Sequence, residues 1–357
     1  MMIYQVVPEF YQFDAISQHA RHIDRMLKEA GAPTILCAQR VVPRYLATEI
    51  LPVTEAFRQI RESDTILFHF SIFSPLIGTI RNLPGRKVMI YHNITPAHFF
   101  EGISRKTAEA CAKGRRQLAE AASIFALALG VSHFNEAELK EAGYEATGVL
   151  PLVVETNTRD DNSFRSLNYM SEKITLLHVG KWAPNKKIED LIKTFYCYHK
   201  INPESRLILV GRNWEWENYT VSVLDLIQRL RLQEDVMILQ GLSPLELAAL
   251  YRAADVYLSM SEHEGFCVPL IEAMAAACPV IAYAAGAVPE TVREAGLLWE
   301  EKAYLEIAEG IRLLTTDGYL QERLRILGKA RTNDFTYEAV SRRFRALLPW
   351  IAGETRT

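Results

Sequence analysis

The sequence lacks the features that mark several large classes of protein. Its five cysteines are scattered and show no CxxC spacing, so they predict reduced thiols and neither a disulfide framework nor a zinc site. The 40 Lys and Arg residues are balanced by 43 Asp and Glu residues, which argues against a nucleic-acid partner. The longest apolar run, 123–131, is about half as long as a membrane span.

No signal peptide is visible at the start of the sequence, and together with the reduced thiols this predicts a cytoplasmic protein. The helix expected over 105–125 is rich in basic residues. Such a helix can bind peripherally to the inner face of an anionic membrane, although a solvated helix face explains the same pattern and is the favoured interpretation. The basic residues are Arg105, Lys106, Lys113, Arg115 and Arg116.

The sequence does contain a repeated alternation of short β-rich runs and amphipathic helical stretches. In the helix expected over 15–31, Ile16, Ile23 and Met26 fall on one face, and Gly31 ends the helix. Buried strands that alternate with helices predict parallel sheets covered by helices, which is the α/β class. The expected strands cover 3–7, 34–38, 65–70, 87–92, 125–129 and 147–151, and then 174–180, 206–211, 236–241, 256–261 and 279–283.

The alternation stops at a polar stretch and then restarts, which predicts two doubly wound, Rossmann-like domains. We expect an amino-terminal domain over 1–155, a linker over 156–173 and a carboxyl-terminal domain over 174–335. A last helix, within 336–357, would pack back toward the amino-terminal domain. Ligands of such sheets bind beyond the carboxyl ends of the strands, here in a cleft between the domains.

The ligand expected there is a phosphorylated molecule other than a bound dinucleotide. The first turn has no GxGxxG, and the sequence contains no P-loop. Lys181, Lys186 and Lys187 instead follow the strand 174–180, just before a helix. Ammonium groups beside a helix N-terminus favour a phosphate or diphosphate, and a solvated lysine cluster is the alternative.

Within the stretch 261–283, two carboxylates frame a short loop and the start of a helix that otherwise have the composition of a buried segment. Glu264 lies in a loop and Glu272 in the helix that follows it. A single glutamate is ordinary surface charge, whereas two around an apolar segment suggest a binding site. A charge at a helix boundary plus a solvated helix residue is the simpler alternative.

From about 174 to 340, the order and spacing of these features resemble the carboxyl-terminal domain of retaining nucleotide-sugar glycosyltransferases of family 4, which have the GT-B fold. Glu264 and Glu272 match that family's E-x7-E motif. In the first half, 91–96 and 132–139 are similar to a branch that includes bacterial mannosyltransferases of surface-polysaccharide synthesis. The resemblance implies two Rossmann-like domains that face a central cleft.

The resemblance also implies a role for each candidate residue. Glu272 would accept hydrogen bonds from the ribose, and Glu264 from the donor sugar, since a carboxylate is an acceptor-only group. Lys181 and Lys186 would neutralise the diphosphate, so no metal or other cofactor is expected, in keeping with the absence of a D-x-D motif. The further donor-binding residues implied are Gly180, Gly211, Gly241, Leu242, Gly265, Phe266, Cys267 and Val268.

The sequence departs from the family pattern at several of these positions. Lys181 stands where Arg is common, and Lys187 and Cys267 stand where Gly is common. The Gly-Gly loop of the first domain is absent. Asp14 can instead cap the helix that begins at Ala15, and Ser17 in its first turn would face the diphosphate.

Two histidines end strands of the first domain. His92 matches a histidine that lies close to the transferred sugar in this family, and we assign it to the catalytic set with Glu264, Lys181 and Lys186. His69 is a second candidate at a strand end. A structural hydrogen-bonding role is the alternative for both histidines.

These features predict a retaining hexosyltransferase of cell-surface polysaccharide synthesis that uses a front-side mechanism. Its donor would be a nucleotide-sugar, with GDP-mannose favoured, and its acceptor a saccharide or a lipid-linked saccharide. Because a lysine in a cleft contributes little to the core, replacing Lys181 or Lys186 should change folding little. A sugar-nucleotide epimerase with the same fold and a non-catalytic partner subunit of a glycosyltransferase complex are the alternatives.

Overall fold

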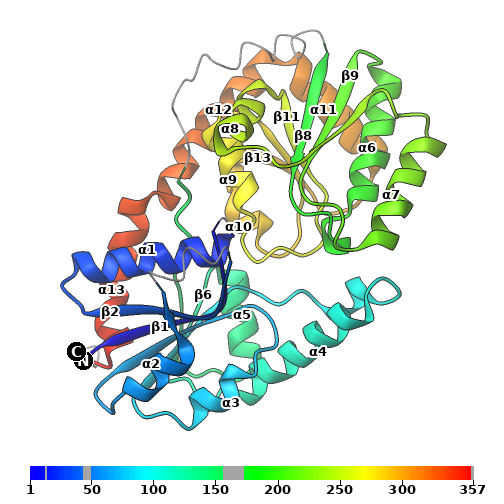
Figure 1. Ribbon diagram of the computed structural model, residues 1–357. Coiled ribbons are helices and arrows are strands. Elements are labelled where there is room, and N and C mark those ends of the chain that lie inside the picture. The colour runs from blue at the N-terminus through cyan, green and yellow to red at the C-terminus, as the bar shows by residue number, and fades with distance from the viewer. Residues whose placement is uncertain (13, 43–49, 156–172, 355–357) are drawn as a thin grey trace. The chain divides into compact units, whose positions relative to one another are not determined.

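The computed structural model describes residues 1–12, 14–42, 50–155 and 173–354. Contacts between residues divide the chain into two units. The first unit consists of Met1–His98, Lys106–Val153 and the segment from Phe335 onward, and the second of Phe99–Arg105 and Val154–Asp334. Each unit has a central sheet with helices on both faces (Figure 1).

The sheet of the first unit is parallel throughout, with the strand order β3-β2-β1-β4-β5-β6-β7. This order places the first strand in the middle, as in a Rossmann fold. Strand β4 is buried along its whole length, because helices cover both faces of a parallel sheet. The strands are β1 (Ile3–Tyr11), β2 (Thr34–Val42), β3 (Leu51–Pro52), β4 (Thr65–Phe70), β5 (Arg86–Tyr91), β6 (Leu127–Gly130) and β7 (Thr147–Val149).

The helices of the first unit lie on both faces of this sheet. The last helix, α13, lies beside α1, and the Trp350 carbonyl on α13 accepts a hydrogen bond from Arg86 at 3.0 Å. The final helix of the sequence is thus packed within the first unit. The helices are α1 (Ala15–Glu29), α2 (Val53–Gln59), α3 (Leu76–Arg81), η2 (Ala97–Phe100), α4 (Arg105–Glu120), α5 (His133–Glu141) and α13 (Tyr337–Ala352), of which η2 and α4 extend across the unit boundaries.

The sheet of the second unit repeats the same topology. Its order is β10-β9-β8-β11-β12-β13, again with every pair parallel. The first strand of the unit, β8, is central, so its carboxyl end opens at the middle of the sheet edge where such folds bind ligands. The strands are β8 (Ile174–Val179), β9 (Ser205–Val210), β10 (Val236–Leu239), β11 (Val256–Ser259), β12 (Val280–Tyr283) and β13 (Gly296–Trp299).

In this unit, α8, α9 and α12 cover one face of the sheet, and α6, α7 and α11 cover the other (Figure 1). A capping box between Ser243 and Glu246 begins α8, the helix that packs against α9. The helices are η4 (Pro184–Lys186), α6 (Ile188–Ile201), α7 (Glu217–Arg229), α8 (Pro244–Ala253), α9 (Val268–Ala275), α10 (Val288–Val292), η5 (Arg293–Ala295), α11 (Tyr304–Thr316), α12 (Gly318–Thr332) and η6 (Asn333–Phe335).

The predicted fold class is confirmed, because both units are α/β with Rossmann-like parallel sheets. The sequence analysis missed β3 and β13, which are short strands at the edge of a sheet and carry little periodic pattern. Residues 99–105 group with the second unit, whereas the sequence-based boundaries put them in the first domain. Apart from residue 173, the predicted linker lies outside the described residues.

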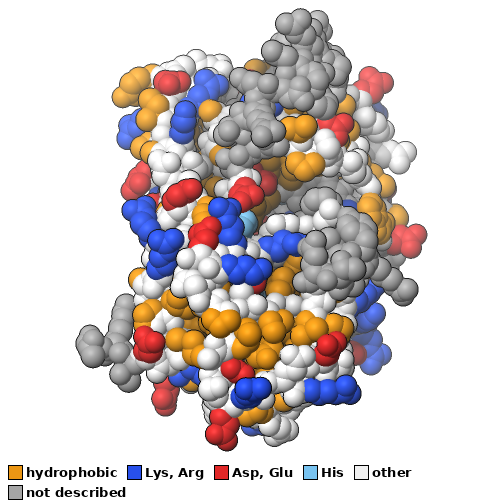
Figure 2. Space-filling view, turned by 60° about the vertical axis from the view of Figure 1, so that its left-hand side comes forward, with side chains coloured by type: hydrophobic (Ala, Val, Ile, Leu, Met, Phe, Trp, Pro, Cys, Tyr) orange, Lys and Arg blue, Asp and Glu red, His pale blue; other side chains and the backbone are white. Residues whose placement is uncertain are grey.

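Among the described helices, none is both long and apolar enough to span a bilayer. The basic helix α4 leaves Arg105, Lys106, Lys113 and Arg116 exposed. Arg115 instead donates to the Ile94 carbonyl and to Glu138, within the first unit. On the face drawn in Figure 2, Lys and Arg side chains lie among Asp and Glu side chains.

Candidate functional site

The carboxyl end of β8 carries the predicted lysine cluster. Lys181 follows the strand, Lys186 ends η4 and Lys187 precedes α6. Two glycines let this loop lie close to the neighbouring strand. A Cβ on Gly211 would lie 1.9 Å from the carbonyl oxygen of Gly180, so only glycine fits there.

Lys186 and Glu264 form a close ion pair in the interior of the second unit. The Lys186 Nζ lies 2.5 Å from Glu264 Oε1, and the two side chains are 23% and 7% exposed. Burial by itself lowers the pKa of a lysine, but the Glu264 charge raises the pKa of Lys186 above its ordinary value. Burial would also raise the pKa of Glu264, yet Lys186 lowers it below its ordinary value. Both groups are therefore charged at neutral pH.

The backbone around Glu264 is fixed by two neighbouring loops. The Ala287 N–H donates to the Glu264 carbonyl at 2.9 Å, and a Cβ on Gly286 would lie 2.5 Å from that same oxygen. From the β8–α6 loop, the Asn185 side chain donates to the His263 carbonyl at 3.0 Å. The sequence analysis did not single out Gly286 or Asn185, because their role depends on contacts between distant segments.

Glu272 lies on α9, as expected, and faces α8. The Tyr251 hydroxyl donates to Glu272 Oε2 at 2.8 Å, which fixes the direction of the carboxylate. Glu272 also lines a pocket of the second unit whose walls include Pro244, Leu247 and Lys329. An apolar wall beside an acceptor-only carboxylate can hold a nucleoside, with the ring on the wall and the ribose hydroxyls on the carboxylate.

The environment of Glu272 predicts a pH dependence of binding. Burial raises the pKa of Glu272, and the hydrogen bond from Tyr251 offsets only part of this effect. On acidification Glu272 is therefore protonated before an ordinary glutamate, whose pKa is about 4.3. We expect calorimetric affinity for a nucleoside diphosphate to fall as the pH approaches this raised pKa, and Glu272→Gln to remove that component. If the affinity falls equally with pH in wild type and in Glu272→Gln, protonation of the ligand's phosphate explains the effect.

Lys181 lies at the start of the loop between β8 and η4, and its side chain is half-exposed. Its Nζ is 2.5 Å from Glu215 Oε2 and lies over the Trp216 ring, 4.7 Å from the centroid. The ammonium group keeps its charge on a flexible stem, so it can turn toward a diphosphate with little effect on the core.

The two positions where glycine is common in the related family have left-handed backbone conformations. The φ angle is 52° at Lys187 and 69° at Cys267. Glycine adopts this conformation without the penalty that a Cβ brings, which explains the family's preference for it. Cys267 is buried, and it is one of the groups that lower the pKa of Glu264.

The other donor-binding candidates lie around these groups. Gly241 and Leu242 form the turn between β10 and α8, Gly265 precedes the buried Phe266, and Val268 begins α9. The sequence-based set in the second unit therefore lies in the loops after β8, β9, β10 and β11 and at the start of α9. These loops all follow carboxyl ends of strands in one parallel sheet.

Ser17 is the one candidate that we do not retain. Asp14 caps α1 as predicted, and accepts from the N–H groups of Ile16 and Ser17 at 2.8 and 3.0 Å. The Ser17 hydroxyl donates to the same Asp14 side chain, accepts from the Tyr11 N–H at 2.9 Å and is buried. The Ser17 hydroxyl makes both of these hydrogen bonds inside the turn and does not face a diphosphate.

His92 and His69 do lie together at the carboxyl ends of β5 and β4. His69 Nδ1 and His92 Nε2 are 2.9 Å apart, and the two rings are stacked. His19 of α1, which the sequence analysis did not consider, lies beside both rings. No local motif marks His19, because it reaches the pair through the packing of α1 on the sheet.

Comparison with solved structures agrees with this architecture. Sucrose-phosphate synthase of Thermosynechococcus elongatus aligns over 99% of this chain and 100% of its own, with a TM-score of 0.77 and 17% identity. Anabaena HepE, solved in complex with UDP-glucose, aligns over 98% of this chain and 100% of its own, with a TM-score of 0.72 and 18% identity. The chain shares the GT-B fold of these glycosyltransferases.

Curated relatives match about half of the chain or less. Lipopolysaccharide 1,2-N-acetylglucosaminetransferase of Salmonella typhimurium is 29% identical over 52% of this chain and 50% of its own length. O-antigen chain mannosyltransferase B of Escherichia coli is 29% identical over 45% of this chain and 42% of its own. A GDP-mannose:cellobiosyl-diphosphopolyprenol alpha-mannosyltransferase of Xanthomonas oryzae is 31% identical over 29% of this chain and 26% of its own.

A family match covers the segment that contains both glutamates and all three lysines. Residues 159–331 match the model of the family described as glycosyl transferases group 1. Over this segment, which is just under half of the chain, the chain is similar to the group 1 glycosyl transferases.

Proposed function

We propose that this protein is a glycosyltransferase that moves a hexose from a nucleotide-sugar to a hydroxyl of a saccharide or lipid-linked acceptor. The observation that carries the proposal is the buried Lys186–Glu264 pair at the carboxyl end of the central strand β8. A buried ion pair is costly to desolvate, and its place at the ligand-binding edge of the sheet favours a functional role.

The proposed donor extends from the Glu272 pocket to the lysine loop. Glu272, held by Tyr251, would accept hydrogen bonds from the ribose diol. Lys181 and Lys186 would meet the diphosphate, and Glu264 the sugar hydroxyls. Because Glu264 is bonded to Lys186 in the structure, the lysine can bridge the carboxylate and the leaving phosphate.

Transfer would proceed with retention by front-side attack. The acceptor hydroxyl would form its bond to the anomeric carbon on the face from which the diphosphate leaves, and the leaving phosphate would take the hydroxyl proton. Lys181 and Lys186 would stabilise the negative charge that grows on that phosphate. The His92 Nδ1, which is not engaged with His69, would face the transferred sugar.

GDP-mannose is our preferred donor, and cell-surface polysaccharide synthesis our preferred setting. Two of the relatives described above carry mannosyltransferase names, and one of these names GDP-mannose as donor. Another of these relatives, matched over 52% of this chain, carries an N-acetylglucosaminetransferase name. We therefore propose the class of donor from the site and the individual sugar from the relatives.

We expect transfer to persist in excess EDTA. Lysine charges meet the diphosphate in this proposal, so no divalent ion is needed to stabilise the leaving group. The measurement is the initial rate of transfer from radiolabelled donor with and without the chelator. Loss of activity in EDTA that magnesium or manganese restores would contradict the proposal.

The reaction products distinguish transfer from the alternative activities. NMR of the products from a donor and an accepting saccharide should show a new glycosidic linkage with the donor's anomeric configuration. An epimerised sugar released without such a linkage would favour the epimerase. A donor that binds but is not turned over would favour the non-catalytic partner subunit.

A further inference from the structure

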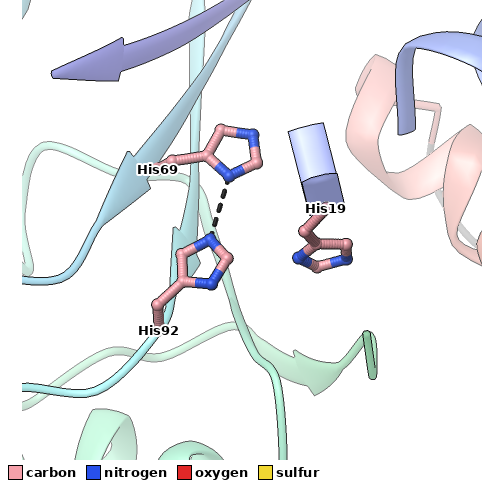
Figure 3. Close-up of side chains that lie close together, drawn as sticks. All are labelled: His19, His69 and His92. Carbon is pink, nitrogen blue, oxygen red and sulfur yellow. Dashed lines mark hydrogen bonds between the residues drawn. The ribbon is translucent and has the colours of Figure 1, made fainter. Parts of the chain in front are cut away.

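Three histidines of the first unit come together, and none of them belongs to residues 159–331, which match the glycosyl transferase family. His19 lies on α1, His69 on β4 and His92 directly after β5 (Figure 3). Each can offer one ring nitrogen, and the three nitrogens lie within 4.8 Å of one another. The sequence analysis expected no metal ligands, because these residues are far apart in the chain and follow no ligand spacing.

The fold brings the three side chains to the same edge of the sheet. Strands β4 and β5 pair in parallel, and the pairing continues as the His92 N–H donates to the Phe70 carbonyl at 2.8 Å. Helix α1 follows β1, which pairs with β4 on its other side. The first turns of α1 therefore lie at the carboxyl edge of the sheet, where His69 and His92 also lie.

Apart from the contact between His69 and His92, the buried ring nitrogens of His19 and His69 lack polar partners among the described residues. His19 and His69 are each 1% exposed. Among the described residues, neither ring nitrogen of His19 nor the Nε2 of His69 has a hydrogen-bond partner. Buried polar groups are usually satisfied, so several such atoms in one cluster point to a missing ligand.

The chemistry of the cluster selects the kind of ligand. All three candidate ligand atoms are ring nitrogens of histidines. A neutral imidazole keeps a lone pair on one nitrogen, which suits a transition-metal ion such as zinc.

The distances are close to those of a tetrahedral site. With a zinc–nitrogen bond of about 2.0–2.1 Å, ligand nitrogens in a tetrahedral site lie about 3.4 Å apart. His69 Nδ1 and His92 Nε2 are 2.9 Å apart. The His19 ring lies nearly perpendicular to both, with its centroid 5.3 Å from that of His92. Small side-chain rotations would bring all three nitrogens to coordination distance.

We propose that His19, His69 and His92 bind a divalent transition-metal ion, with zinc as the representative ion. Three histidine ligands leave one tetrahedral position open for water or a small ligand. The ion would tie α1 to β4 and β5 and so stabilise the first unit. The metal would not contact the diphosphate, which lysines of the second unit meet in the proposed transfer reaction. His92 is shared by the two proposals, with its Nε2 toward His69 and the metal and its Nδ1 toward the sugar.

The test uses the full chain without a histidine tag. After removal of metal with a chelator, the chain is titrated with zinc alone, and bound metal is measured by mass spectrometry after desalting. We expect about one zinc per chain and, at saturation, a rise in Tm of about 5 °C or more. Cobalt in place of zinc should give the visible absorption of a tetrahedral complex.

His19→Gln and His92→Gln should each weaken zinc binding by at least about 100-fold. Loss of a residue that only hydrogen-bonds to a metal ligand costs up to about 100-fold, and loss of a ligand itself should cost at least as much. His133→Gln is the matched control, because His133 lies in the same unit with its side chain 75% exposed, and it should bind zinc like wild type. Should a buried variant fail to fold, the cobalt spectrum of the wild-type chain still decides. Zinc absent from the wild-type chain, or bound equally by His19→Gln and wild type, would overturn the proposal.

Discussion

Replacing Lys186 by alanine should lower the rate of sugar transfer by about two to three orders of magnitude, the range for loss of one preorganised charge stabiliser. Lys181→Ala should lower it by a similar factor. The reason is that both ammonium groups would face the diphosphate as negative charge grows on the leaving group. The measurement is kcat for transfer from a saturating donor.

Lys186→Ala and Lys181→Ala should differ in their free energy of unfolding, which distinguishes the structural roles of the two lysines. Sequence analysis alone predicted that neither lysine matters for folding. For Lys186 the structure predicts the opposite, because its removal leaves the buried Glu264 carboxylate without its ion-pair partner. Removing one partner of a buried pair costs about 3–5 kcal/mol in the free energy of unfolding.

Lys181 pairs with an exposed carboxylate, so Lys181→Ala should unfold at nearly the wild-type denaturant concentration. Lys200→Ala, which removes an exposed lysine at the end of α6, is the control and should keep both activity and stability. Wild-type turnover in Lys181→Ala would remove that residue from the diphosphate site. Wild-type turnover in a folded Lys186→Ala would do the same for Lys186.

Replacing Glu272 by alanine should weaken binding of the bare nucleoside diphosphate by about 1.5–3 kcal/mol, the range for a hydrogen bond to a charged group. The same variant should bind the intact donor more weakly by a similar amount, since ribose is present in both ligands. Isothermal titration calorimetry with each ligand measures this difference.

Glu264→Gln should behave differently, because Glu264 would contact only the sugar. It should lower the transfer rate and leave the affinity for the nucleoside diphosphate unchanged or higher, since Lys186 is released from its ion pair. Glu306, exposed in the first turn of α11, gives the control Glu306→Ala. Equal loss of diphosphate affinity in the Glu264 and Glu272 variants would show that the division between sugar and ribose is wrong.

Much of the fold could be predicted from the sequence, because local residue patterns indicate most of its strands and helices. Buried runs such as 65–70 and 174–179 alternate with amphipathic helices, and Asp14 and Thr336 mark the starts of α1 and α13. The short edge strands β3 and β13 carry no such pattern. The grouping of 99–105 with the second unit depends on ring contacts of Phe99 with His263 and of Phe100 with Trp216, which no local signal reveals.

The candidate site was predicted as residue types, whereas its pairings required the structure. The positions of Glu264, Glu272 and the lysines follow from loops at the ends of parallel strands. The hydrogen bond from Tyr251 to Glu272 joins α8 and α9, whose packing is a tertiary property. Ser17 was misassigned because a serine in a first helical turn can either face a ligand or complete the cap, and here it completes the cap.

The central claim is that the second unit binds a nucleotide-sugar at Glu272 and the lysine loop. The most direct test is a thermal-shift screen of GDP-, UDP- and ADP-sugars on wild type, Glu272→Ala and Glu306→Ala. At about 100-fold excess over Kd, a ligand stabilises by about 2.7 kcal/mol, which corresponds to a rise in Tm of about 5 °C or more. The account predicts that at least one donor gives such a rise in wild type and in Glu306→Ala, and a much smaller one in Glu272→Ala. No rise with any donor, or the same rise in Glu272→Ala, would contradict it.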